Sequence, residues 1–212
     1  SIQTSAKVAR IVAMFDLIGG QRQDALDLLS GAYRFGQSMN ADGELISRLI
    51  GITVRAISIK GLVIDALNAC ETPMEIHALR QRLAWLDHMS IPADPESILN
   101  DELPGLLRQI DFSSFPYRPN FTEAVTRARV ADALWANLRM GAAVWESLLG
   151  SGEFPQSTEA FRALFDDRLP ADPFQKDDAP IKFITTHEAC TVYSIGPDKV
   201  DDMAKIAYDP SN

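Results

Sequence analysis

Metal-binding and catalytic side chains are scarce in this 212-residue sequence. Two cysteines and three histidines leave little material for a zinc or haem site. His77 and His88 share one predicted helix, but eleven residues of rise, roughly 16 Å, keep them from ligating the same metal. The sequence also lacks the Gly-x-Ser-x-Gly, Gly-x4-Gly-Lys-Ser/Thr, His-Glu-x2-His and Cys-x2-Cys motifs. These absences argue against the hydrolase, nucleotide-binding, metalloprotease and zinc-ribbon classes.

Positive charge is also in short supply. The chain has 20 Lys and Arg against 29 Asp and Glu, for a net charge of −9. A surface with that balance repels phosphate groups, so we expect no nucleic-acid partner and no charge-driven attachment to anionic lipid.

The sequence has no long uninterrupted apolar run. Its longest apolar stretch, 45–67, is broken by Arg48, Arg55, Lys60 and Asp65, so we expect no direct membrane span in this chain. The chain opens on Ser1 without Met and without a leader of the basic-then-apolar type, so we expect a truncated or processed product.

The two cysteines, Cys70 and Cys190, are 120 residues apart. They could form a long-range disulfide in an exported protein or remain as two buried thiols, and sequence does not supply the Cα separation that decides between these.

Most of the chain has the apolar spacing of amphipathic helices. The first predicted helix stops at Gly19-Gly20, and its apolar stripe is Val8, Ile11, Val12, Phe15 and Ile18. The second ends in the turn-rich 40–43, and its inward residues are predicted to be Ala25, Leu26, Leu28, Leu29, Ala32, Tyr33 and Gly36. The third, about 44–69, is apolar except for a narrow polar stripe, so we place it at the centre of the fold.

Three later helices have recognisable start signals. Thr72-Pro73-Met74-Glu75 is a capping box with proline at the first helical position, and the helix runs to about Met89. Asp94-Pro95-Glu96 starts a fifth helix, which Pro104 should kink or end. A long helix starts at a second capping-box pattern, 120–123, and reaches about Leu149. The segment 111–120 before it is rich in Pro, Ser and aromatics and is the best candidate boundary.

After a short helix over about 157–167, the pattern changes to β. Two short runs, 181–185 and 191–195, flank a turn near His187, which predicts a hairpin. The predicted fold is therefore mainly α: an array of antiparallel helices with a small C-terminal antiparallel β-hairpin. We divide it into a helical region, 1–115, and a second part, 116–212, that contains the long helix, the hairpin and an acidic loop, and expect the two to pack as one body.

Acidic residues concentrate near the C-terminus. The segment 166–212 has ten acids against five bases, so it alone carries −5. Asp198, Asp201 and Asp202 follow Ser194 within eight residues, and several carboxylates in one loop suit a hard cation such as calcium. Ser194, Asp198, Asp201 and Asp202 are therefore candidate calcium ligands, and a solvated acidic turn is the alternative.

The order of motifs in this part resembles the C-terminal region of type II secretion major pseudopilins and related pilin-like proteins. A helix leads to 150–155 (GSGEFP), a short helix, 169–174 (LPADPF), a β-run and 192–202 (VYSIGPDKVDD). In that family the loop after the Tyr-Ser motif binds calcium, which implies the same role for the four residues above. Lys199 stands where the family usually has glycine, and about 115 helical residues replace the long apolar pilin helix, so a filament subunit is not expected. The helical region resembles uncharacterised exported bacterial proteins with the same tail.

These observations favour a non-enzymatic structural or protein-binding module of a bacterial envelope or exported protein, in the periplasm or cell envelope, with a role in secretion or surface assembly. A tetratricopeptide-like scaffold is the first alternative, because Gly20-x3-Asp24-Ala-Leu-x-Leu-Leu is similar to one helix of such repeats. That scaffold predicts a groove lined by apolar residues of the second and third helices. An enzyme of unassigned type, with a site near His187 or the acidic loop, is the second alternative.

Overall fold

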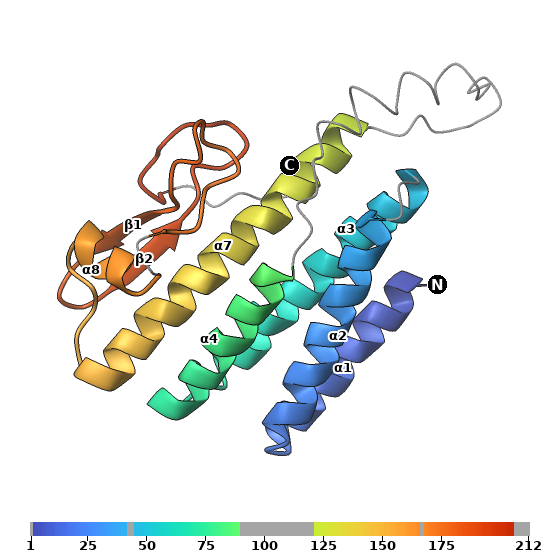
Figure 1. Ribbon diagram of the computed structural model, residues 1–212, viewed down its shortest axis with the longest axis horizontal. Coiled ribbons are helices and arrows are strands. Elements are labelled where there is room, and N and C mark those ends of the chain that lie inside the picture. The colour runs from blue at the N-terminus through green and yellow to red at the C-terminus, as the bar shows by residue number, and fades with distance from the viewer. Residues whose placement is uncertain (1, 42–44, 90–120, 166–167, 206–212) are drawn as a thin grey trace.

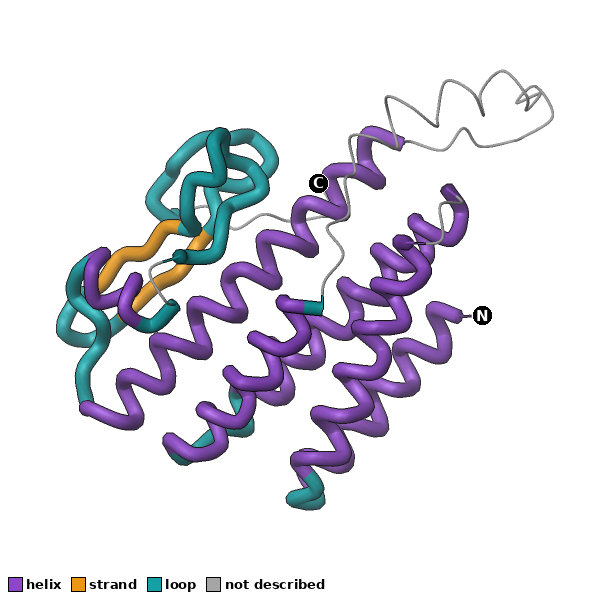
Figure 2. Tube along the Cα trace, viewed as in Figure 1, coloured by secondary structure: helices purple, strands orange, loops and turns teal. Residues whose placement is uncertain are grey.

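The computed structural model describes residues 2–41, 45–89, 121–165 and 168–205. Its helices lie side by side as an array, and a two-stranded sheet covers the outer side of the last long helix (Figures 1 and 2). This confirms the mainly helical prediction with a C-terminal antiparallel hairpin. The elements are α1 Ile2–Ile18, α2 Arg22–Ala41, α3 Leu45–Lys60, η1 Gly61–Leu67, α4 Pro73–His88, α7 Phe121–Ser151, α8 Thr158–Ala163, β1 Lys182–Thr185 and β2 Cys190–Tyr193.

Helix α1 contacts the array through small residues. Ala6 and Ala13 are its buried side chains, and Ala13 belongs to the main apolar cluster. The bulky apolar stripe identified from the sequence points elsewhere: its members stay 43–76% exposed. Alanine lets a helix approach its neighbours closely, so the side that packs here is the one with the smaller residues.

Helices α2 and α3 pack closely. A Cβ at Gly36 would lie 2.8 Å from the carbonyl oxygen of Gly51, so any side chain at Gly36 would push the two helices apart. The predicted inward face of α2 is confirmed at Ala25, Leu29 and Tyr33, which are fully buried.

The third predicted helix, 44–69, divides into two parts within the described residues. An α-helical part ends at Lys60 and continues directly as the π-helical segment η1. A π-helical turn inserts an extra residue, so it changes which side chains face the core after Gly61.

Two residues of the polar stripe of this third helix are buried. Arg55 and Ser58 are 5% and 1% exposed. Arg55 pairs with Asp132 of α7 at 2.7 Å and lies over the ring of Tyr33 at 5.5 Å. Burial acts to lower the pKa of Arg55, but Asp132 and Tyr33 outweigh it and raise that pKa. Arg55 therefore joins α3 to α7.

Helix α4 begins as predicted. The Thr72 hydroxyl accepts from the Glu75 amide, and the Glu75 carboxylate accepts from the Thr72 amide, which completes a capping box with Pro73 at the first turn. The predicted fifth helix at Asp94, its break at Pro104 and the boundary at 111–120 lie outside the described residues.

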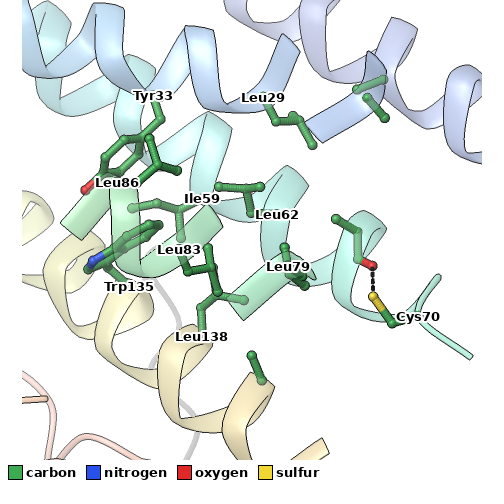
Figure 3. Close-up of a cluster of buried hydrophobic side chains, with 14 of the residues drawn as sticks. Leu29, Tyr33, Ile59, Leu62, Cys70, Leu79, Leu83, Leu86, Trp135 and Leu138 are labelled. Carbon is green, nitrogen blue, oxygen red and sulfur yellow. Dashed lines mark hydrogen bonds between the residues drawn. The ribbon is translucent and has the colours of Figure 1, made fainter. Parts of the chain in front are cut away.

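Helix α7 contributes to two apolar clusters. Trp135 and Leu138 face the main cluster with α2, α3 and α4 (Figure 3), where Trp135 stacks on Tyr33 at 4.6 Å. Met140 and Val144 face a second cluster with Phe161 of α8 and with the residues around the hairpin. The long helix is thus the element on which both the helical array and the C-terminal unit are built.

The hairpin forms at the predicted place. Strand β1 pairs antiparallel with β2, with Lys182 opposite Tyr193 and Thr185 opposite Cys190. Cys190 and Cys70 are both free thiols, Cys70 in the main cluster and Cys190 on β2, so the disulfide alternative is not formed.

Candidate functional site

The C-terminal segment around the hairpin is organised around one buried carboxylate, Asp172, which is 1% exposed. Its Oδ1 accepts hydrogen bonds from the Phe174 amide at 3.0 Å and from the Ser194 hydroxyl at 2.7 Å. Its Oδ2 accepts from the Ile195 amide at 2.9 Å and from the Gln175 side chain at 3.2 Å. Asp172 therefore ties the turn after 169–171 to the chain that leaves β2.

This contact engages one of the four candidate calcium ligands. The Ser194 hydroxyl donates a hydrogen bond to Asp172, and its oxygen accepts one from the Gly196 amide at 3.1 Å. Ser194 is thus part of the carboxylate-centred turn. Sequence reasoning had placed it with the acidic loop and had overlooked Asp172.

The acidic loop is joined to the hairpin by Asp201. The Asp201 carboxylate pairs with Lys182 of β1 at 2.8 Å and accepts from the Tyr193 hydroxyl at 3.1 Å. The hydrogen bond from Lys182 is the main reason that the pKa of Asp201 lies below its ordinary value. Asp198 caps its own turn by accepting from the Val200 amide at 3.2 Å.

The geometry of the described residues does not assemble a metal-ligand set. No group of three or more His, Cys, Asp or Glu side chains that could hold a metal ion is found within them. Calcium at Ser194, Asp198, Asp201 and Asp202 therefore stays a prediction, and binding would require Asp201 to exchange Lys182 for the cation.

Lys199 of this loop has a left-handed backbone, with φ +59°. Glycine adopts that conformation without a steric penalty, whereas lysine does not.

His187, the residue named for the enzyme alternative, lies in the hairpin turn and is exposed. The turn is held by Thr186, whose hydroxyl accepts from the amides of Glu188 and Ala189. Residues 186–189 thus form a four-residue hairpin loop, and His187 is one of its exposed residues.

A polar network joins α4, α7 and the segment after α8, and sequence reasoning missed it. Glu146 accepts a hydrogen bond from Arg80 and contacts His77 Nδ1 at 2.6 Å. Arg80 also donates to the Leu164 carbonyl and lies over the ring of Phe165. Partial burial acts to raise the pKa of Glu146, but the hydrogen bonds from Arg80 and His77 outweigh it and the pKa lies below its ordinary value. Arg80 thus holds α4 to α7 and to the segment after α8.

A contiguous row of exposed apolar side chains is the stripe of α1, here called the α1 face. Its five residues and their exposed fractions are Val8 52%, Ile11 51%, Val12 43%, Phe15 63% and Ile18 76%. Beside it an open hollow of about 440 Å³ lies between α1 and α2, lined by Thr4, Ser5, Val8, Ala9, Val12 and Leu28. Val8 and Val12 belong to both, so the face and the hollow form one continuous surface.

A second hollow of about 390 Å³ lies between α2 and α4. Trp85 and Leu26 supply its apolar part, and Arg82 and two glutamines supply its polar part. Arg82 also pairs with Asp27 of α2 at 2.6 Å. A tetratricopeptide-like scaffold predicts a groove lined by apolar residues of the second and third helices. The two hollows described here lie instead between α1 and α2 and between α2 and α4.

Comparison with known proteins adds no relative: no family model, curated protein or solved structure matches this chain. Within the described parts of the chain, every helix is too short or too polar to cross a membrane.

Proposed function

We propose that this chain is a non-enzymatic protein-binding module of a bacterial envelope or exported protein, and that the α1 face is its binding surface. The observation that carries this proposal is the exposure of five large apolar side chains along one helix. Single exposed apolar residues are ordinary, but a contiguous patch of several hundred Å² is typical of a protein–protein contact.

The architecture supports a binding role for this face. In Figure 1, α1 lies at one edge of the array and the hairpin lies beyond α7 at the other. Among the residues that the structure describes, the C-terminal unit therefore lies away from the α1 face. The C-terminal unit, with its resemblance to pilin-like proteins, supports the envelope assignment and a role in secretion or surface assembly.

The proposal is tested on the chain produced in its own bacterium. Cells are fractionated, and the size of the species that contains the chain is measured by velocity sedimentation of each native fraction. We expect the chain in envelope or exported fractions, in species heavier than its own 23.4 kDa. A chain that sediments alone in every fraction would overturn the proposal.

The test variant is Val12→Ser with Phe15→Gln. It removes apolar surface at two exposed positions of the α1 face and should not disturb the core. The matched control is Met74→Gln, because Met74 is 79% exposed on α4 and lies outside the α1 face. The test variant should shift the chain to lighter species, and the control should sediment like the wild type.

A further inference from the structure

We infer that the partner of the α1 face is a second copy of this chain, so that the protein forms a symmetric dimer through α1. This inference rests on the proposed function and names its partner. It is argued from the area of the face, its shape and its charge.

The area of the face suits a self-association contact. The exposed fractions of its five residues leave on the order of 500 Å² of apolar surface, given that large side chains expose up to about 200 Å². The adjoining hollow adds Ala9, Leu28 and the end of α1 at Thr4. Together they reach about 600 Å², which is what each partner contributes at the lower end of specific interfaces.

The shape of the surface is self-complementary. A twofold contact uses the same patch on both copies, so that patch must carry both projecting and receiving parts. Phe15 and Ile18 are the most exposed members of the face and project from it. The hollow between α1 and α2 is apolar around Val8, Val12 and Leu28, and at about 440 Å³ it is large enough for an aromatic side chain.

The charge of α1 permits two copies to approach. The helix carries Lys7 and Arg10 against the single acid Asp16, whereas the whole chain has a net charge of −9. Arg10 is already paired with Asp65 at 2.9 Å. Part of the acidic excess lies away from this edge, because the described residues 168–205, in the unit beyond α7, have seven acids against five bases. The overall negative charge disfavours an anionic lipid surface as the occupant.

Sedimentation equilibrium of the purified 212-residue chain tests the inference. The apparent mass should rise with concentration from 23.4 kDa toward twice that value. Val12→Ser with Phe15→Gln should weaken association at least about tenfold, because it removes apolar area at the centre of the contact. Ala9→Phe, which fills the hollow, should weaken it as well, and Met74→Gln should leave it unchanged.

Far-UV circular dichroism and thermal melts of each variant show whether it remains folded, and the exposed substitutions should preserve the melt. A wild type that stays monomeric up to about 1 mM overturns the inference. A dimer that survives the α1 substitutions overturns it too. If the purified chain is monomeric while native fractions hold it in an α1-dependent heavier species, the partner is a different protein, and the proposed function stands without this inference.

Discussion

Replacement of Asp172 by alanine should release the turn after 169–171 from the chain that leaves β2. Asp172 is buried and accepts four hydrogen bonds, of which two come from backbone amides at Phe174 and Ile195. A hydrogen bond to a charged group contributes about 1.5–3 kcal/mol, and each buried donor left unpaired costs about 1–3 kcal/mol. Because the four bonds are cooperative and water can reach some of the freed donors, we expect a loss of about 3–5 kcal/mol for this unit.

Hydrogen–deuterium exchange measures this loss at the site. In the wild type the amides of Phe174 and Ile195 should be protected, and in Asp172→Ala both should exchange much faster. Asp172→Asn retains the shape of the side chain and one of its two acceptor oxygens, so these amides should lose less protection than in Asp172→Ala. Glu188→Ala is the control, because Glu188 is exposed in the hairpin turn. Unchanged protection in Asp172→Ala, with an unfolding free energy within about 1 kcal/mol of the wild type, would refute the role assigned to Asp172.

Three further perturbations follow from the contacts described above. Arg55→Met should lower the free energy of unfolding, measured in urea, by about 3–5 kcal/mol, because it leaves the partly buried Asp132 without its cation. The double variant with Asp132→Leu should recover much of this loss. An Arg55→Met chain as stable as the wild type would contradict the role of this pair. Since the pKa of Glu146 is lower in the folded chain than in the unfolded chain, its pairing stabilises the fold at neutral pH and that contribution is lost as the pH falls and Glu146 takes up its proton. The stability gap between wild type and Glu146→Gln, of about 1 kcal/mol at pH 7, should therefore close toward acid pH, and a gap independent of pH would count against the pairing. If the acidic loop binds calcium, the melting temperature of the wild type should rise with calcium and fall with a chelator, and that of Asp201→Asn should respond less; equal melts across a wide calcium range would remove the site.

Local signals in the sequence predicted local structure well. The capping box at Thr72 and the hairpin around Thr186 depend on residues a few positions apart, so their geometry can be read from the chain itself. The exposed α1 face could not be predicted in this way. Apolar spacing shows that a helix has two unlike sides, but which side meets the array depends on the neighbouring helices, and here Ala6 and Ala13 pack inward.

The candidate site shows the same limit at longer range. The sequence placed Ser194 near the acidic loop, but Asp172, twenty-two residues earlier in the chain, binds its hydroxyl instead. The signal that could have identified Asp172 is its position between alanine and proline in a turn after an apolar pair, where a carboxylate often accepts from amides two residues on. The polar residue Arg55 was likewise assigned to a stripe, and only the fold shows that Asp132 of α7 meets it.

Site-specific photo-crosslinking inside the cell of origin shows whether a protein covers the α1 face. A photoreactive amino acid replaces Phe15, and in the control it replaces Met74, which is similarly exposed. After irradiation, mass spectrometry maps the residues joined to each probe. The account predicts a discrete adduct from position 15 to peptides of α1 or α2 in a second copy, and none from position 74. No adduct from position 15, or equal and scattered adducts from both positions, would contradict it.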